Sequence, residues 1–246
     1  MQNLEGKVVV ITGASAGIGK AIAIKLAESG VKVVLGARNT EQLEKVAKEI
    51  KTNGGEALFI KTDVNNKADL MQLVNVAVEQ YGKLDIMVNN AGIARISRID
   101  ELDIEGWDEM IDSNIKGVLY GMAAAIPVFK KQQSGHIVNI ISTSGIKIVP
   151  TQGVYAGTKN AVRTITEAFR QESDGSIRIT GISPGYIKTD FAVKSVKTDE
   201  MKTAASKAVE QMAINPEAIA NAVIYAISQP KDVEVGDIVI RPSKQN

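Results

Sequence analysis

Short apolar runs alternate with longer amphipathic segments along almost the whole chain. Several of these runs are rich in β-branched residues and have few polar interruptions, such as VVVI at 8–11 and IVNII at 137–141. Such runs are typical of strands that are covered by helices on both faces. Strands are therefore predicted at 7–12, 32–36, 56–61, 84–89, 135–142, 178–183 and 237–241.

The segments between these strands have helical periodicity. They predict helices at 17–28, 40–51, 66–81, 106–131, 155–172 and 217–228. Strict alternation of strands and helices favours right-handed βαβ units, and hence an α/β fold with a Rossmann-type, doubly wound parallel sheet of about seven strands and helices on both faces. The chain shows no internal repeat, low-complexity tract or linker. We therefore expect residues 1–246 to form a single domain.

Composition narrows the possible partners. The chain has 29 basic and 28 acidic residues, and no basic run indicates binding to nucleic acid or to an anionic membrane. It has no cysteine and one histidine, which argues against disulfides and against a metal site. No signal peptide or membrane-spanning run is visible in the sequence, so a cytoplasmic location is expected.

A glycine-rich turn follows the first predicted strand and reads TGASAGIG at 12–19. Glycines at such a junction let the backbone approach a pyrophosphate, and the free N–H groups of the next helix can then face the phosphates. An ordinary tight turn is the alternative. The position of the turn in a βαβ chain favours a dinucleotide site, whose expected residues are Gly13, Ser15, Gly17, Ile18 and Gly19.

The end of the second predicted strand bears on the choice of cofactor. A carboxylate at this place normally binds the adenosine ribose of NAD, whereas this chain has Ala37 and Arg38. Arginine can bind a 2′-phosphate through charge-assisted hydrogen bonds. The alternative is a solvated arginine at a strand end. We predict NADP(H) as the cofactor.

Three further strand ends carry residues suited to a ligand at the carboxyl edge of a parallel sheet. Ordinary turn residues are the alternative for each of them. The polar segment that follows the last of them, within 186–215, is lysine-rich and weakly helical, and we predict that it forms a substrate lid. The candidate binding residues at these strand ends are Asp63, Val64, Asn90, Ala91, Gly92, Pro184, Gly185 and Thr189.

The candidate catalytic residues lie in the third quarter of the chain. Tyr155 and Lys159 are four residues apart at the start of a predicted helix, and Ser142 ends the strand before it. Residues at i and i+4 share a helix face, so the ammonium group is expected to lower the pKa of the phenol. Such a phenol can exchange a proton with an alcohol or carbonyl oxygen. Asn114 can hold a water that relays protons to Lys159, or it can simply satisfy backbone groups.

The middle of segment 106–131, GVLYGMAAAIPVF, is apolar on more than one face. The sheet can bury only one face of such a helix, and the other apolar face must pack against something else. A subunit interface is therefore predicted here. Deep burial within one chain is the alternative. With the helix at 155–172 included, we expect a homo-oligomer, a dimer or tetramer.

Together these motifs resemble the short-chain dehydrogenase/reductase family, in order and over most of the chain. The matching features are TGASAGIG, Asp63, NNAG at 89–92, Asn114, Ser142, Tyr155-x-x-x-Lys159 and Pro184-Gly185…Thr189. The C-terminal segment VEVGDIVIRPSKQN is similar to the NADP-preferring branch near serine and 3-hydroxy acid dehydrogenases and small carbonyl reductases. It departs from the 3-oxoacyl-carrier-protein reductases, so a thioester reductase is disfavoured.

The resemblance implies a role for each residue. Tyr155 would be the acid/base, Ser142 would bond the carbonyl oxygen, Lys159 would hold the nicotinamide ribose, and Asn114 would position a water. It also implies that the Ile187 backbone and Thr189 meet the nicotinamide carboxamide and that Asn90 sits against the ribose. The implied function is hydride transfer between NADP(H) and a small-molecule alcohol or carbonyl substrate.

Other functions and the substrate class stay open at this point. One rival is an NADP-binding redox sensor that has lost catalysis, which the intact Ser-Tyr-Lys spacing argues against. A sugar-nucleotide epimerase or dehydratase would need a larger substrate domain. If any of Arg95, Lys147, Lys188 or Lys194 reaches the pocket, a carboxylate-bearing substrate is favoured. If all four point to water, a neutral ketone or aldehyde is favoured.

Overall fold

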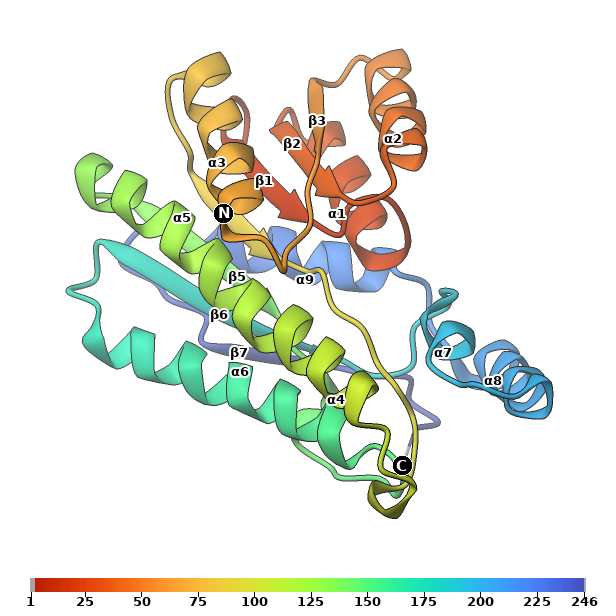
Figure 1. The fold of residues 1–246 in the computed structure, drawn as a ribbon. Helices are drawn as coiled ribbons and strands as arrows, with labels where there is room; N and C mark the ends of the chain where they lie inside the picture. The colour runs from red at the N-terminus through yellow and green to blue at the C-terminus, as the bar shows by residue number, and fades with distance from the viewer. Residues whose placement is uncertain (1–2, 246) are drawn as a thin grey trace.

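The fold is described here for residues 3–245 of a computed structural model (Figure 1). The sheet within this range has seven parallel strands in the order β3-β2-β1-β4-β5-β6-β7. The fold prediction is confirmed, and the predicted strand bounds shift by at most two residues. The strands are β1 Val8–Thr12, β2 Lys32–Ala37, β3 Ala57–Lys61, β4 Ile86–Asn89, β5 Gly135–Ile140, β6 Ile177–Pro184 and β7 Asp237–Ile240.

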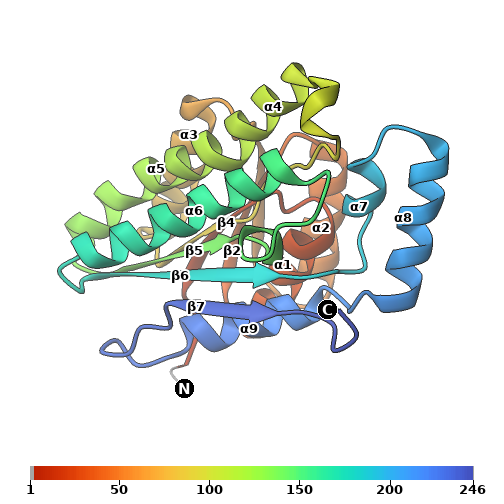
Figure 2. The ribbon, with the colours of Figure 1, turned by 90° about the horizontal axis from the view of Figure 1, so that it is seen from below.

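Helices cover both faces of this sheet, as Figures 1 and 2 show. One core lies between the sheet and α1, α2 and α9, and the other lies between the sheet and α3, α5 and α6. The middle strands are buried on both sides, which explains their continuous apolar sequences. The helices are α1 Gly17–Glu28, α2 Thr40–Thr52, α3 Lys67–Tyr81, α4 Ile104–Ile111, α5 Gly117–Gln132, α6 Gly153–Glu172, α7 Phe191–Lys194, α8 Asp199–Met212 and α9 Glu217–Ile227.

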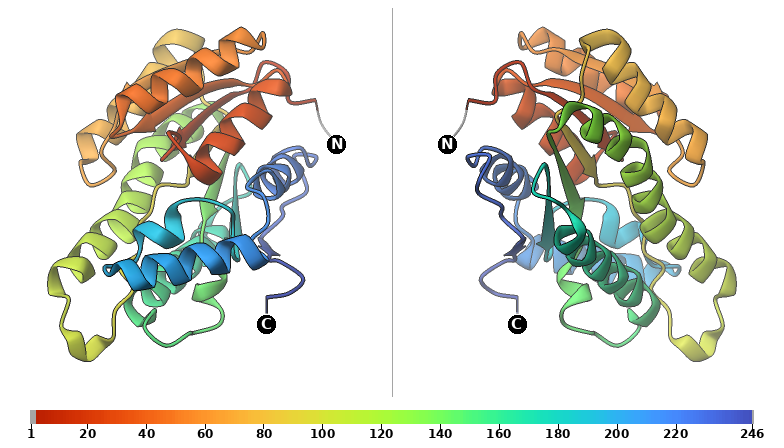
Figure 3. Two further views of the ribbon diagram at one scale, coloured as in Figure 1. Left: turned by 90° about the vertical axis from the view of Figure 1, so that its right-hand side faces the viewer. Right: turned by 90° about the vertical axis from the view of Figure 1, so that its left-hand side faces the viewer.

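Strand order reverses on either side of β1, which pairs with both β2 and β4. The connections from β1 and β4 leave the sheet in opposite directions, and ligands of doubly wound folds bind beyond the carboxyl ends of the strands at this point. In Figure 2 the arrow of β6 points to the end of the molecule at which α7 and α8 lie. The left view of Figure 3 looks onto these two helices. The site is therefore expected between the strand ends and this excursion.

The predicted helix at 106–131 is confirmed as an uninterrupted helical stretch over residues 104–132, which contains a π-helical insertion. The structure has α4, then a π-helical segment Asp112–Lys116, then α5. A π turn inserts an extra residue into the helical ladder and is frequent at functional sites. The strand predicted to end at Ser142 ends at Ile140, so Ser142 lies in the connection that follows.

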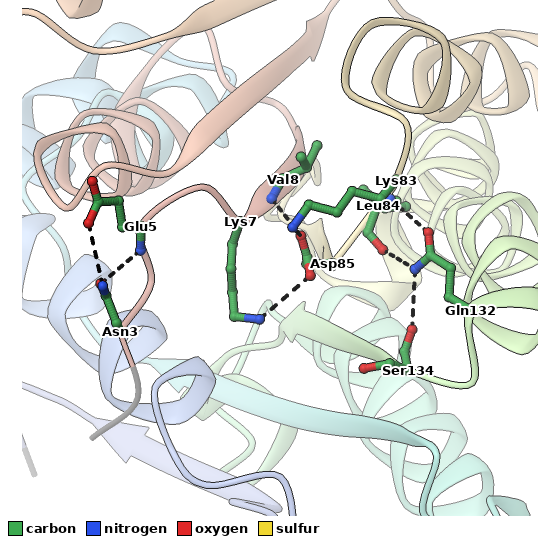
Figure 4. A network of polar contacts seen from close by, with 9 residues as sticks. All are labelled: Asn3, Glu5, Lys7, Val8, Lys83, Leu84, Asp85, Gln132 and Ser134. Carbon is green, nitrogen blue, oxygen red and sulfur yellow. Dashed lines mark hydrogen bonds and ion pairs between the residues drawn. The ribbon is translucent and has the colours of Figure 1, made fainter.

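The amino-terminal edge of the sheet is held together by side-chain bonds (Figure 4). Asp85 Oδ2 accepts from the Val8 N–H at 2.8 Å, and the carboxylate forms ion pairs with Lys7 and Lys83. Gln132, the last residue of α5, bonds the N–H and the carbonyl of Leu84. These contacts fix β1, β4 and α5 relative to one another at the edge opposite the ligand-binding edge.

His136 is buried at the start of β5. Its Nε2 lies 2.8 Å from Thr180 Oγ1, and that hydroxyl donates to the Val235 carbonyl at 2.6 Å. Because the Thr180 proton is used in this way, Nε2 must carry a proton and donate it. Burial, with smaller contributions from Arg178 and Lys7, lowers the pKa of His136 to about 3.

This buried histidine predicts a loss of stability in acid. The unfolded chain binds a proton near the ordinary histidine pKa of 6.5 and the folded chain only near pH 3. Between these values the unfolded state holds more protons, so the free energy of unfolding falls as pH falls, by up to about 1.4 kcal/mol per pH unit. His136→Gln is expected to lack this component in urea unfolding from pH 7 to pH 4. Parallel losses in both proteins would contradict the assignment.

Candidate active site

The glycine-rich turn joins β1 to α1 and holds its backbone close to the end of β4. Gly13 and Gly17 have φ angles of +64° and +56°, in the left-handed region that favours glycine. At Gly19 a side chain would overlap the Gly13 carbonyl oxygen and lie 2.5 Å from Asn90 Nδ2. The N-cap residue Ala16 has no capping side chain, so the first N–H groups of α1 are not bonded by one. This arrangement fits a pyrophosphate.

The other two predicted residues of this turn, Ser15 and Ile18, have different surroundings. Ser15 lies partly buried just before α1, and Ile18 packs against the core beneath the helix. Asn90 Nδ2 donates to the Thr12 and Gly13 carbonyls at 2.9 and 3.2 Å, so its side chain braces the turn from β4.

Two more strand ends flank the turn. Arg38 is exposed directly after β2, and no ion pair of its guanidinium occurs within residues 3–245. Asp63 follows β3, and its carboxylate accepts from the Asn65 N–H at 3.0 Å, which leaves its other oxygen without a side-chain partner among those residues. Val64 packs against Gly117 at the start of α5. Arg38 and Asp63 are thus placed where an adenosine moiety would lie.

The end of β4 connects the turn to the catalytic residues. The N–H groups of Asn90 and Ala91 both donate to Thr12 Oγ1, at 3.0 and 3.1 Å. A Cβ at Gly92 would lie 3.0 Å from Asn114 Oδ1 and 3.2 Å from Lys159 Nζ. A glycine is therefore needed for this backbone to pass so close to both polar groups.

Asn114 is fully buried within the π-helical segment. Its Oδ1 accepts from the Ile93 N–H at 2.8 Å, and its Nδ2 donates to the Ile93 carbonyl and to Thr158 Oγ1. Both amide hydrogens are used, so only Oδ1 can take another bond. Any water held by Asn114 must therefore donate to Oδ1.

Thr158 is a residue that the sequence reasoning missed. Its hydroxyl accepts from Asn114 and donates to the Tyr155 carbonyl at 2.8 Å, so it joins the π-helical segment to α6. The sequence feature that could have identified Thr158 is its position three residues after Tyr155, on the same helix face. Thr158 acts through Asn114 and Tyr155 as a positioning residue.

Ser142, Tyr155 and Lys159 lie together at the start of α6, as predicted from their spacing. Lys159 Nζ donates to the Ile140 carbonyl at 3.0 Å and lies 6.0 Å from the centre of the Tyr155 ring. Ser142 Oγ accepts from the Ser144 N–H at 3.1 Å, and the Ser142 side chain lies close enough to Tyr155 to act on its pKa. An ammonium group has three donors, so two remain on Lys159 for a ligand.

The predicted lowering of the tyrosine pKa is wrong for this structure. Burial raises the pKa of Tyr155 to about 12, with the Ser142 hydrogen bond working in the opposite direction. Burial also lowers the pKa of Lys159 to about 8. Desolvation of both groups therefore outweighs the attraction between the phenolate and the ammonium. The sequence could not show the direction of the tyrosine pKa shift, because the side chains that bury Tyr155 come from segments far from it in the chain.

The excursion after β6 closes over the site. A Cβ at Gly17 would lie 3.1 Å from Thr189 Cγ2, so Thr189 contacts the glycine-rich turn. Phe191 meets the Tyr155 ring at a centroid distance of 6.0 Å and an angle of 50°. The base of the excursion is held by the Gly185 N–H, which donates to the Ile240 carbonyl, and by the paired segments at 186–188 and 214.

Chemically, this constellation combines a phenol, a hydroxyl and an ammonium with a cradle for a dinucleotide. Of the sequence-predicted residues, the structure places the glycine-rich turn against the end of β4 and against Thr189, and it places Asn114 and Lys159 beside Gly92. Pro184 ends β6, and Ile187 lies in the segment that follows it. Arg38 and Asp63 lie at the ends of β2 and β3, on the other side of the turn. Within residues 3–245 no cluster of three or more histidine or acidic side chains could hold a metal ion, and no helix is long and apolar enough to span a membrane.

Comparison with known proteins decides the family. A family model described as short chain dehydrogenase matches residues 7–201. The chain belongs to this family. The family match and the solved structures of similar proteins support a nicotinamide dinucleotide as the cofactor. The protein is an oxidoreductase.

Relatives and solved structures agree with this assignment. An uncharacterized oxidoreductase of Listeria monocytogenes is 45% identical over 245 residues, 98% of each chain. An alcohol dehydrogenase from the archaeon Thermococcus sibiricus, complexed with 5-hydroxy-NADP, superposes with a TM-score of 0.86 at 32% identity, over 98% of each chain.

Two further structures show that relatives of this fold hold either nicotinamide cofactor. The closed form of a serine dehydrogenase, complexed with NADP⁺, has a TM-score of 0.89 at 29% identity and covers 97% of this chain and 96% of its own. A short-chain dehydrogenase/reductase from Burkholderia phymatum, in complex with NAD, has a TM-score of 0.88 at 26% identity over 97% and 90%.

Proposed function

We propose that this short-chain dehydrogenase is an NADP(H)-dependent oxidoreductase that interconverts a secondary alcohol and its carbonyl compound, with Tyr155 as general acid/base. The observation that carries the proposal is the convergence of Ser142, Tyr155 and Lys159 beside Gly92, at the ligand-binding edge of the sheet. When bound, NADP(H) supplies or accepts the hydride. The protein positions the substrate oxygen and moves the proton.

In the reduction direction, Tyr155 is the proton donor. With a pKa of about 12, the phenol is protonated at neutral pH, which suits a group that must give a proton to a developing alkoxide. The Ser142 hydroxyl would donate a second hydrogen bond to the same oxygen. The ammonium of Lys159, with two donors free, would bind the nicotinamide ribose and replenish the tyrosine proton through a water on Asn114 Oδ1.

The remaining cofactor contacts follow from position. Arg38 would bind the 2′-phosphate, and Asp63 and Val64 would flank the adenine. Gly13, Ser15, Gly17, Ile18 and Gly19 would hold the pyrophosphate. Asn90, Ala91 and Gly92 would line the ribose, and the segment with Pro184, Gly185, Ile187 and Thr189 would meet the carboxamide. We also propose that residues 186–215 act as a lid, since Phe191 already contacts Tyr155.

Homo-oligomerisation through the helices at 106–131 and 155–172 is part of the proposal. On α5, Leu119 is 41% exposed, and Ala123 and Pro127, one and two turns further along, are also exposed. This apolar stripe needs cover that a single chain does not supply.

We also propose that the protein is located in the cytoplasm.

The test is NADPH consumption with a panel of keto acids, keto esters, ketones and aldehydes, with NADH alongside. Turnover of at least one carbonyl class with NADPH is expected. If NADPH binds and no member of the panel is reduced, the proposed carbonyl reduction fails and the redox-sensor alternative gains support.

Arg38→Ala tests the cofactor preference. It is expected to weaken NADPH binding by about 10- to 100-fold and to leave NADH binding unchanged, because charge-assisted bonds to a phosphate contribute about 1.5–3 kcal/mol. Titration of cofactor fluorescence measures both affinities. Lys48→Ala, an exposed lysine on the neighbouring helix α2, is the control. Equal efficiency of wild-type protein with NADH and NADPH would refute the role of Arg38.

A further inference from the structure

The basic side chains around the active-site mouth do not serve a substrate. Arg95, in the loop after β4, donates from Nε and Nη2 to Glu109 Oε2 on α4 at 2.9 and 2.7 Å. Lys194 is paired with Asp190 on the outside of α7, where both side chains are more than 70% exposed. Lys147 and Lys188 are exposed to solvent. All four candidate cations thus point to a carboxylate or to water.

A fifth cation near the mouth is also neutralised. Lys197, just before α8, pairs with Asp103 at 3.0 Å, and the Asp103 side chain is only 14% exposed. In the same place the Ile96 N–H donates to the Ser195 carbonyl at 2.8 Å. These two contacts tie the lid to the loop that follows β4. The ion pair connects the segment before α8 to the residue that precedes α4.

The Tyr155 ring packs against apolar side chains. Tyr155 forms a small buried cluster with Ala94 and Met110, separate from the two main cores. Phe191 covers the ring from the lid. The partly buried side chains that pack against this cluster are Ile93, Ile96, Trp107 and Val154.

The rim of the site is apolar as well. Ile146, Ile148 and Val149, in the segment after Ser142, are 50%, 76% and 43% exposed, and Phe191 on the lid is 40% exposed. Large apolar side chains that gather at a polar site mark a ligand-binding surface. An apolar group of the substrate can gain free energy by covering them, at about 25 cal/mol per Å² of buried apolar area.

We propose that the substrate is a neutral carbonyl compound with an apolar substituent, and that Glu109 sets this specificity by holding Arg95 away from the site. This inference rests on the proposed function. In the reaction, the carbonyl carbon takes a hydride from NADPH, which becomes NADP⁺, and the oxygen takes the Tyr155 proton. A carboxylate on the substrate would lose its hydration among these side chains and gain no cation in return.

The experiment compares a 4-oxo acid with its methyl ester, which share one carbon skeleton, using intact protein and NADPH. The ester is expected to have a kcat/KM at least about 100-fold higher, since an unpaired charge in such a site costs more than the roughly 1–3 kcal/mol of a missing methylene. Reduction of the acid with equal or better efficiency would overturn the inference and leave the oxidoreductase proposal standing. If neither compound is reduced while another carbonyl of the panel is, the inference fails and the proposed function stands.

Glu109→Gln tests the residue itself. It removes the charge that holds Arg95, so kcat/KM for the acid should rise about 10-fold, equivalent to about 1.4 kcal/mol, while the ester value stays within about twofold. Glu105→Gln is the matched control, because Glu105 is exposed on the same helix and is not bonded to Arg95. An unchanged acid-to-ester ratio in Glu109→Gln would refute the role of Glu109.

Discussion

Tyr155→Phe is expected to lower kcat by about 10²- to 10⁴-fold and to leave NADPH affinity within about twofold of wild type. The substitution removes one hydroxyl from a ring that is packed against Ala94, Met110 and Phe191, so the ring and its packing stay in place. What is lost is the proton that the phenol holds at neutral pH because its pKa is about 12. The effect is therefore on the chemical step.

The measurement is steady-state reduction of the best carbonyl from the panel, with NADPH binding followed separately by fluorescence. Tyr225→Phe is the matched control, since Tyr225 lies on α9 with a ring that is 53% exposed. Near wild-type turnover in Tyr155→Phe would exclude Tyr155 as the acid. Loss of NADPH binding would indicate a structural defect in place of a chemical one.

Gly19→Ala is expected to weaken NADPH binding by at least about 10-fold and to cost about 1–3 kcal/mol of stability. An alanine Cβ would overlap the Gly13 carbonyl oxygen and lie 2.5 Å from Asn90 Nδ2. Neither atom can move without a loss of stability, because the oxygen belongs to the backbone of the turn and Asn90 Nδ2 is bonded to the Thr12 and Gly13 carbonyls. The turn itself must shift, and with it the N–H groups meant for the pyrophosphate.

Gly236→Ala provides the comparison for this effect. The nearest atom to a Cβ at Gly236 is Arg170 Cδ at 3.9 Å, an ordinary contact, and the backbone there is not in the left-handed region. Thermal unfolding and NADPH titration of both variants separate stability from binding. If Gly19→Ala binds NADPH as tightly as Gly236→Ala does, the turn is not the pyrophosphate site.

Catalytic chemistry was predictable where it depends on spacing along one element. Tyr155 and Lys159 share a helix face because 3.6 residues make a turn, whatever the rest of the fold does. The glycine-rich turn was predictable for a similar local reason, since positive φ angles at Gly13 and Gly17 select glycine. The structure places Asn114 and Lys159 beside Gly92, and Tyr155 and Lys159 on one helix; their catalytic role stays a prediction.

Interactions between elements could not be predicted in the same way. The π-helical segment that aims Asn114 at Ile93 and Thr158 appears as an ordinary helix in the sequence pattern. Arg95 is bonded to Glu109, which is fourteen residues away in the chain. This contact forms only because α4 is placed beside the loop that holds Arg95. For the same reason the sequence could not choose between charged and neutral substrates.

The sequence by itself determined the order of strands and helices, the place of the glycine-rich turn and the identity of the proposed reacting groups, because each of these depends on residues that are neighbours in the chain. Only the tertiary structure decided the protonation of Tyr155 and the charge of its pocket. The pKa of a phenol depends on how much water remains around it, and that is set by Phe191 on the lid and Met110 on α4. Desolvation is a property of the packed molecule.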